Sequence, residues 1–371
     1  MRKKIIALLL VVCLMVAGCS SGKENKVINS IPQKNESIRY VEQKSTVPFS
    51  SSTTELDYIA EQSVNVILNA DGVLEWYTVS RPVKGKYIDK ASNAIHNQQQ
   101  LSPEWLGYKI WRFTQDKQGE WIREAVGESV VDEDRTIKGS RVFYDDNQVL
   151  HLVIHYESPN EDGNTEYTLR LFQLEQSNWT EEGKFSYTEE EEEVIEPVNY
   201  CVSPSRELIV ARANGEIVKF DIVSGDQIDS STDSRFDLTC AVFQDGSGYC
   251  KDDEKNRVVI FDMDTLVESA SISLPEKRTQ GSEILSVDDQ GNMYVLNCLG
   301  IYRAKPGEDS FTRLSEADIF YEASVDNLVF LDFCVLDENQ MYVYMYDSST
   351  ESMDDYFDKI VNVENISDEK K

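Results

Sequence analysis

The chain has 371 residues, with 67 acidic and 36 basic side chains and a formal net charge of −31 at pH 7. A surface this acidic repels nucleic acids and anionic lipid head groups, which argues against DNA or RNA binding and against electrostatic attachment to a membrane. Any membrane attachment must therefore come from another feature of the chain.

The N-terminus has the pattern of an export signal. Three basic residues, Arg2 to Lys4, precede an apolar run that ends at Gly18 and is shorter than the roughly 20 residues of a spanning helix. The sequence Val16-Ala17-Gly18-Cys19 resembles the lipobox of bacterial lipoproteins. This resemblance implies removal of residues 1–18, a diacylglycerol on the sulfur of Cys19, and a lipid-anchored protein on the extracytoplasmic face of the cell membrane. A plain secretory signal is the alternative.

Removing residues 1–18 takes away three positive charges and leaves the mature chain at about −34. Residues 19–54 are rich in Ser, Lys, Glu, Asn and Thr and poor in aromatics, which predicts a lipidated flexible tether. We expect a folded body over residues 55–366 and a disordered tail over residues 367–371. No segment after Gly18 is apolar enough to span a bilayer.

The folded body alternates apolar and polar residues in short runs separated by turns rich in Asp, Asn, Gly and Ser. Val149–His155 and Met341–Met345 are examples, and this period of two predicts β-strands. A weak repeat aligns on six valines, each followed by a polar turn and then by an apolar pair. They are Val66, Val142, Val202, Val242, Val287 and Val335. Each copy predicts a β-hairpin.

A second strand pair with an aromatic residue follows each of the first five hairpins. The segments are Ile110–Phe113, Leu169–Phe172, Ile217–Phe220, Val259–Phe261 and Ile301–Arg303. Two hairpins per unit give a four-stranded blade, and blades that cannot bury both faces alone stack radially. We therefore predict an all-β propeller of six or seven four-stranded blades, with a β-sandwich as the alternative. The 76-residue first spacing leaves room for a seventh blade, and Ser37–Val41 is a candidate ring-closing strand.

These repeats resemble the lipid-anchored β-propellers of Gram-positive bacteria, whose units read strand, D-x-x-G/N, Tyr-Val, short turn, Ile-Tyr. Such propellers stand alone or precede a solute-binding domain of a sugar transporter. The resemblance covers about 280 of the 371 residues, and it implies a propeller without a solute-binding domain.

Five cysteines lie in the body, at 201, 240, 250, 298 and 334. Each lies in a strand-like apolar context, so buried thiols are the first interpretation, and Cys240 with Cys250 is the alternative disulfide. His151 and His155, four residues apart on one strand, are too far apart for one metal ion, so structural roles are expected. His96 is the third histidine.

No nucleophile motif is present, and paired carboxylates are too abundant in this chain to indicate catalysis. Ser286–Asn292 resembles the Asp-box of sialidases, but its spacing differs by one residue, and a hairpin turn is the preferred interpretation. We expect no cofactor. Calcium is the alternative at three acidic segments, Glu189–Glu193, Asn160–Asn164 and Asp252–Glu254.

Four tryptophans and a tyrosine (Trp105, Tyr108, Trp111, Trp121 and Trp179) lie in the long first units. They suit either a sugar-stacking site or packing between blades, and packing is the more common role. The sequence thus predicts a non-catalytic scaffold for a protein or carbohydrate partner. A glycan hydrolase or lyase with channel carboxylates is one alternative, and an accessory component of a sugar transporter is the other.

Overall fold

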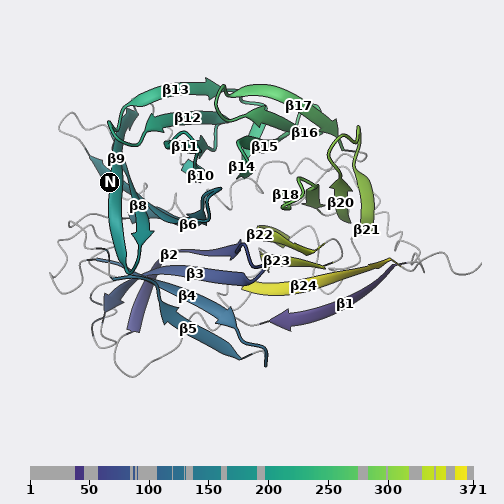
Figure 1. The fold of residues 1–371 in the computed structure, drawn as a ribbon, viewed down its shortest axis with the longest axis horizontal. Helices are drawn as coiled ribbons and strands as arrows, with labels where there is room; N and C mark the ends of the chain where they lie inside the picture. The colour runs from purple at the N-terminus through teal and green to yellow at the C-terminus, as the bar shows by residue number, and fades with distance from the viewer. Residues whose placement is uncertain are drawn as a thin grey trace, which may run out of the picture.

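The structure is a computed structural model that describes residues 38–45, 57–83, 87, 90, 107–118, 120–128, 130, 137–159, 165–189, 197–274, 283–297, 300–316, 328–337, 340–347 and 356–365. Within these ranges, twenty-four β-strands pair into six four-stranded antiparallel sheets. Figure 1 shows the sheets as blades that follow one another around a centre. The described residues therefore form a six-bladed β-propeller.

In each of the first three blades, the strands follow one another in chain order from the centre of the ring outward. Blade 1 contains β2 (Asp57–Leu68), β3 (Leu74–Val83), β4 (Lys109–Gln115) and β5 (Trp121–Ala125). Blade 2 contains β6 (Ile137–Tyr144), β7 (Leu150–Pro159), β8 (Thr165–Glu175) and β9 (Asn178–Glu189). Blade 3 contains β10 (Pro197–Val202), β11 (Glu207–Arg212), β12 (Glu216–Asp221) and β13 (Gln227–Thr232).

The remaining blades follow the same order, except that the last one takes its outer strand from the N-terminal side of the chain. Blade 4 contains β14 (Phe236–Gln244), β15 (Ser247–Asp252), β16 (Arg257–Asp262) and β17 (Val267–Ser273). Blade 5 contains β18 (Glu283–Val287), β19 (Met293–Asn297), β20 (Gly300–Ala304) and β21 (Thr312–Glu316). Blade 6 contains β22 (Leu328–Asp337), β23 (Gln340–Asp347), β24 (Tyr356–Asn365) and β1 (Ile38–Ser45).

Hydrophobic packing between neighbouring blades closes the ring. The buried side chains form six clusters, one at each interface between adjacent blades, including the interface between blades 6 and 1. The innermost strands contact one another in the order β2, β6, β10, β14, β18, β22 and back to β2. Each sheet thus buries both faces against its neighbours, which is why a single blade is not an independent unit.

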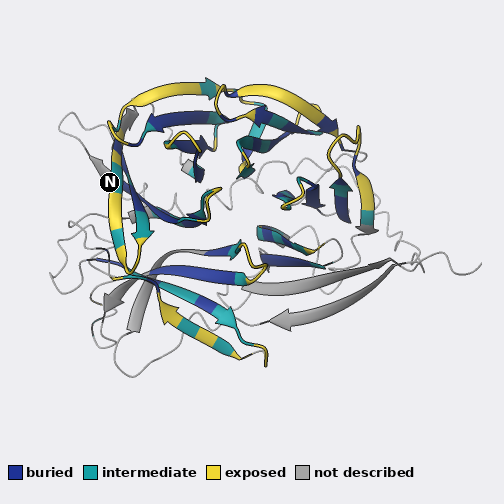
Figure 2. Cartoon of the chain, in the orientation of Figure 1, coloured by how far each residue is buried: buried dark blue, intermediate teal, exposed yellow. Residues whose placement is uncertain are grey.

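The exposed surface lies on the outer strands. Every residue of β13 except Ser231 and every residue of β17 except Ile272 is exposed, whereas most of β11 and β12 is buried. Figure 2 shows this change from dark blue inner strands to yellow outer strands around the upper half of the ring. The core is therefore annular and follows the middle strands of the blades.

Hydrogen bonding between β1 and β24 also closes the ring, and it joins a strand from the N-terminal side of the chain to the last described strand. Their register runs from Ile38 opposite Asn365 to Ser45 opposite Asp358. This confirms residues 38–41 of the candidate closing strand, and Ser37 lies outside the described residues. It also corrects the predicted tether over residues 19–54, since residues 38–45 belong to blade 6. The polar composition of this segment suits an outermost strand, which needs apolar residues on fewer positions than an inner one.

Side-chain hydrogen bonds link innermost strands that do not pair as a sheet. Asn65 of β2 accepts the backbone N–H of Val142 at 3.0 Å, and Asn199 of β10 donates to the carbonyl of Ala241. Gln244 of β14 donates to the carbonyl of Asp288 at 2.8 Å. These bonds satisfy backbone groups that face another blade, where no ladder partner is available.

The predicted repeat corresponds closely to the blades. All six anchor valines lie on innermost strands, and the five aromatic segments lie on the third strand of blades 1 to 5. Val202 and Val287 are the last ladder residues before their turns, whereas Val66 and Val142 lie two residues earlier. An error of two leaves the side chain on the same face, so the alternating pattern hid the shift.

Two open alternatives are decided by this topology. Between β2 and β6 the described residues form only β3, β4 and β5, so the described part of the 76-residue spacing contains no further blade. The β-sandwich alternative is wrong, because the strands form six separate sheets rather than two packed layers. Short strands and polar turns are common to both folds, and only the pairing pattern distinguishes them.

Candidate functional site

A buried carboxylate connects blades 1 and 2. Glu75 of β3 is 3% exposed and accepts hydrogen bonds from the hydroxyls of Tyr77 at 2.6 Å and Tyr144 at 2.9 Å. The Nη1 of Arg112 donates to it at 3.0 Å, and the Nδ2 of Asn69 donates at 3.1 Å. Four donors offset the cost of burying this charge, and Tyr144 on β6 brings the second blade into the network.

The two tyrosines act as hydrogen-bond donors. Burial and the neighbouring Glu75 carboxylate raise the pKa of Tyr77, and burial raises that of Tyr144. Both phenols therefore stay protonated at neutral pH, which argues against a phenolate nucleophile. Their role is to orient the Glu75 carboxylate and to fix the position of the Tyr144 ring.

Beside this network an open cleft of about 570 Å³ lies between blades 1 and 2. Arg112 and Tyr144 line it from the side of the buried network. The other lining residues come from the end of β5 and from the β6–β7 and β8–β9 turns, and they are Glu124, Ala125, Val126, Gly127, Gln148, Val149, Leu150, Gln173, Leu174, Glu175, Gln176 and Ser177. The volume lies in the range of small-ligand sites.

One wall of the cleft is fixed across the interface between the blades. The Nε1 of Trp179 donates to the carbonyl of Val126 at 2.9 Å, and the N–H of Glu128 donates to the carbonyl of Ser177 at 2.8 Å. Gly127 has a φ of +70°, and a Cβ there would lie 3.0 Å from Leu174 and Trp179. The left-handed backbone and the close approach both favour glycine.

The charges around the cleft are mostly negative. Arg112 is paired with Glu75 and also with Glu124, to which its Nε donates at 2.6 Å. Glu175 adds a third carboxylate at the rim. Lys109, which donates to the carbonyl of Gly127 at 3.4 Å, adds a second positive charge, so three carboxylates stand against two cations and the cleft disfavours an anionic ligand.

A recurrent turn positions the polar side chains on the second strand of several blades. The side chains of Asn69, Asp145 and Asp288 each accept the backbone N–H groups two and four residues ahead. Each also bonds the side chain six residues ahead, which is Glu75, His151 or Tyr294. The Ser286–Asn292 segment is therefore a hairpin turn, as preferred from its sequence.

His151 is part of this turn structure. It is fully buried, with Nε2 3.3 Å from Asp145 and Nδ1 3.2 Å from Glu182. Burial opposes ionisation of Glu182, but the close approach of His151 and the hydrogen bond from Arg206 outweigh it and lower the pKa of Glu182. Since Arg206 belongs to blade 3, the cluster joins blades 2 and 3.

The remaining histidines and the acidic segments considered as alternative calcium sites are placed as follows. His155 is buried and stacks on Tyr167, with ring centroids 5.4 Å apart. Among the described residues, no group of three or more His, Cys, Asp or Glu side chains can hold a metal ion. His96, Asn160–Asn164 and residues 190–193 lie outside the described residues. Asp252 forms an ion pair with Arg257 at 2.9 Å, and Asp253 forms one with Lys251 at 2.7 Å.

Four of the body cysteines are free thiols, and Cys298 lies outside the described residues. Cys250 packs between blades 3 and 4, whereas Cys240 packs between blades 4 and 5. The two therefore lie on opposite faces of one sheet, which argues against the alternative disulfide. Burial raises the pKa of Cys201, Cys240, Cys250 and Cys334, as expected for unreactive thiols.

The tryptophans serve packing. Trp111 and Trp121 pack against the cluster between blades 6 and 1, where Trp76 meets Trp121 edge to face at 4.8 Å. Trp179 and Tyr108 belong to the interface between blades 1 and 2. Trp105 lies outside the described residues. Of the described members of this group, only Trp179 supports the cleft. It does not line the cleft but holds the lining residue Val126 through its hydrogen bond.

A second carboxylate lies near the central axis. Asp332 of β22 interacts electrostatically with Arg141 of β6, and these two strands flank β2 in the ring. Burial raises the pKa of Asp332 to about 7, against the opposing effects of Arg141 and a hydrogen bond from the backbone of Val66. This carboxyl group titrates near neutral pH.

The tight turns at one end of the blades form an acidic face. We define the turn face as the described links between the first and second and between the third and fourth strands of each blade, which lie at one end because neighbouring strands are antiparallel. Its three basic residues are Lys117, Arg206 and Lys305. Its twelve acidic residues are Asp71, Asp116, Glu120, Asp145, Asp146, Asp226, Asp245, Asp264, Asp288, Asp289, Glu308 and Asp309.

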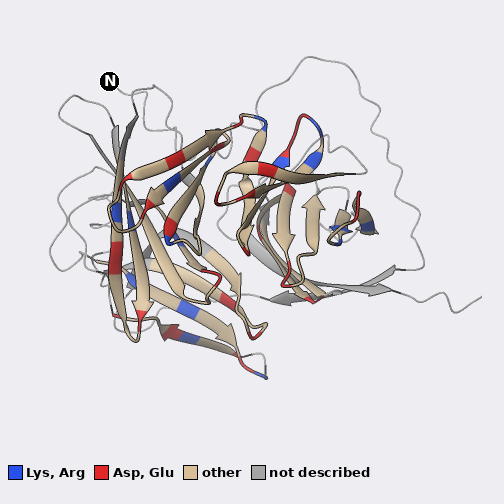
Figure 3. Cartoon of the chain, turned by 45° about the horizontal axis from the view of Figure 1, so that its top comes forward, with Lys and Arg blue, Asp and Glu red and all other residues tan. Residues whose placement is uncertain are grey.

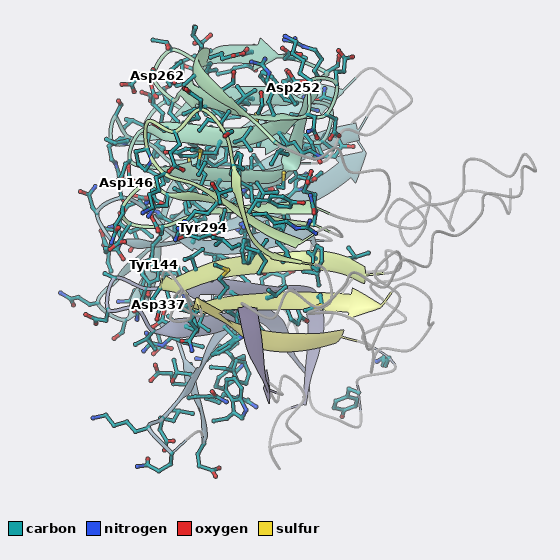
Figure 4. The ribbon with its side chains drawn as sticks, turned by 90° about the vertical axis from the view of Figure 1, so that its right-hand side faces the viewer. Tyr144, Asp146, Asp252, Asp262, Tyr294 and Asp337 are labelled. Atoms are coloured by element: carbon teal, nitrogen blue, oxygen red, sulfur yellow. The ribbon has the colours of Figure 1, made fainter. Side chains whose placement is uncertain are left out.

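Figure 4 shows the two ends of the disc. In Figure 4 Tyr144, Asp146, Asp262, Tyr294 and Asp337 lie toward one side of the disc, and Asp252 lies toward the other. Figure 3 shows more acidic than basic positions along the described ribbon. Near the centre of the face, Asp146 of blade 2 accepts the backbone N–H of Asp245 of blade 4 at 3.2 Å. Contacts between turns thus hold the face in one shape.

The predicted lipidation site, Cys19, lies outside the described residues, as do residues 1–37 as a whole. In the part of the chain that the structure describes, no helix is long and apolar enough to cross a membrane.

Glu75 and the cleft were missed by the sequence-based search. The available signal was a lone charged residue inside an apolar strand, six residues after a turn asparagine, at the same offset as Asp145 with His151 and Asp288 with Tyr294. Only the fold brings Arg112 and the turns of blade 2 to the same place.

Comparison with known proteins gives structural likeness alone. The WD40 β-propeller domain of Doa1 aligns over 84% of this chain and 95% of its own, with 11% identity and a TM-score of 0.40. The C-terminal WD40 domain of Sif2 aligns over 82% of this chain and 74% of its own, with 8% identity and a TM-score of 0.39. No protein-family model and no curated protein matches the sequence.

Proposed function

We propose that the protein is a non-catalytic binding scaffold, held on the extracytoplasmic face of the cell membrane by lipid on Cys19, whose turn face docks a partner. The proposal rests mainly on the excess of acidic over basic residues in turns held by Asx-type hydrogen bonds. A rigid surface of one sign attracts a partner of the opposite sign. This favours a protein with a basic docking surface over an acidic polymer.

The anchor and the docking surface are tested separately. Cys19→Ala is expected to abolish labelling by an alkyne fatty acid and to release the protein from the membrane fraction. Unchanged labelling and fractionation would remove the anchor from the proposal.

Docking is tested with the full-length protein as bait for solubilised membranes of the producing cell. We expect one component to be retained and to elute at about 0.5 M NaCl, where charge attraction is screened. Asp71→Asn combined with Asp289→Asn should weaken retention. The control, Asp229→Asn with Glu254→Gln, removes the same charge away from the turn face and should not. Retention that is insensitive to salt and to both variants would contradict docking through this face.

A glycan hydrolase or lyase is the second candidate, and Asp332 is the observation that favours it. A carboxyl group with a pKa of about 7 beside an arginine suits a general acid. Asp332→Asn would then abolish any glycan cleavage that the wild-type protein shows. Cleavage at the wild-type rate by this variant would dismiss Asp332 as the acid.

A further inference from the structure

We infer that the cleft between blades 1 and 2 is a binding site for a neutral, hydroxyl-rich ligand of the carbohydrate class. The cleft opens among the turns of blade 2 that belong to the turn face, but it uses different chemistry from the acidic docking proposed above, because its lining offers amide and hydroxyl groups.

The donors and acceptors of the cleft match hydroxyl groups. Each amide side chain of Gln148, Gln173 and Gln176 offers both donors and an acceptor, and Ser177 and Tyr144 add hydroxyl oxygens. A sugar hydroxyl both donates and accepts, so paired donors and acceptors on one surface suit it. Leu174 and Val149 add apolar surface to the lining, and the C–H face of a sugar ring can pack against it.

The charge balance narrows the ligand class. Arg112 is held by Glu75 and Glu124, so its charge is already compensated, and Glu175 stands at the rim. A phosphate, a sulfate or an acidic sugar would enter a region of net negative charge. A neutral sugar carries no such penalty, and its affinity should depend little on salt.

The site is also organised before a ligand arrives. Glu75 is buried with four donors, so Tyr144 and Arg112 are held in place on the inner side of the cleft. The opposite wall is held by the bonds of Trp179 and Glu128 across the blade interface. A ligand therefore loses little affinity to ordering the protein.

The test is titration calorimetry of the full-length protein in detergent with a panel of probes. The neutral probes are maltotetraose, xylotetraose, cellotetraose and N-acetylchitotetraose, and the anionic probes are trigalacturonate and inorganic phosphate. We expect at least one neutral probe to bind, with an affinity that changes less than about twofold between low and high salt, and both anions to fail. Binding only by anions, or by none of the six probes, would overturn the inference.

Variants locate the binding. Gln173→Ala and Gln148→Gly should each lower the affinity for the neutral probe about tenfold, which corresponds to the loss of one or two hydrogen bonds. Glycine is chosen at position 148 because its φ is +62°. Gln290→Ala, in the matching turn of blade 5, is the control and should bind as the wild type does. Equal losses in all three variants, or none in the cleft variants, would place the site elsewhere.

The two proposals fail independently. The Asp71 and Asp289 variant should lose docking but keep its sugar affinity, because neither residue lines the cleft. A peptide that competes for the cleft, with no sugar bound, would overturn the carbohydrate assignment while leaving the scaffold intact.

Discussion

The stability lost on replacing a carboxylate in this protein depends on how many buried hydrogen-bond donors lose their acceptor. Glu75 serves four donors inside the protein, whereas Glu124 pairs with the same Arg112 at the surface, with a side chain that is 47% exposed. The two carboxylates thus form a natural comparison of a buried and an exposed partner for one guanidinium.

Glu75→Gln is expected to lower the free energy of unfolding by about 2–4 kcal/mol, because the amide cannot accept all four hydrogen bonds. Arg112 and one tyrosine would then lack a hydrogen-bond acceptor. Glu124→Gln, the control, should cost less than about 1 kcal/mol, because its pair is solvated. Urea denaturation of both variants measures the difference. Equal losses would mean that the buried network contributes no special stability.

Glycine at position 248 is required by an aromatic neighbour. Gly248 pairs with Phe261 across β15 and β16, and a Cβ there would lie 2.0 Å from the buried phenylalanine ring. Gly248→Ala should therefore destabilise the protein by about 1–3 kcal/mol. Gly139→Ala is the control, since the nearest atom lies 3.9 Å away, and it should be neutral or slightly stabilising. Thermal denaturation compares the two.

At the scale of elements, the pairing of β1 with β24 closes the ring. Without β1, the backbone groups of β24 become an exposed edge, which is a template for aggregation. The pairing also means that β1, the first described strand, depends on β24, the last described strand, for its hydrogen bonds.

A protein beginning at Thr46 should therefore be less stable than one beginning at Ser37. We expect a loss of about 3 kcal/mol, equivalent to roughly 4 °C in Tm for a protein of this size. The truncated protein should also associate as its concentration rises. Differential scanning calorimetry and light scattering measure both effects. Identical Tm values would show that β1 contributes nothing to closure.

At the scale of the whole molecule, the ring places Asp332 and Arg141 near its axis from blades 6 and 2. Because the folded-state pKa of Asp332 is raised from 3.8 to about 7, ionisation of this group opposes folding. Its contribution to stability is full below pH 4 and is lost as the pH rises toward 7, since the unfolded chain releases the proton first.

Asp332→Asn should accordingly raise the free energy of unfolding relative to the wild type by about 1–3 kcal/mol at pH 8 and by almost nothing at pH 4. Asp309→Asn, an exposed turn residue, is the control and should show no such pH-dependent difference. Urea titrations at the two pH values give the comparison. A constant offset for Asp332→Asn would mean that its carboxyl group is not desolvated.

The all-β class, the six hairpin anchors and the third strands can be predicted from the residues alone, because alternation and turn residues are local properties of the chain. The closure by β1, the opposite faces of Cys240 and Cys250, and the contact of Glu75 with Arg112 and Tyr144 follow from the way the blades assemble. Those contacts join residues far apart in the chain, and their positions depend on how the blades pack around the ring, which no local pattern records.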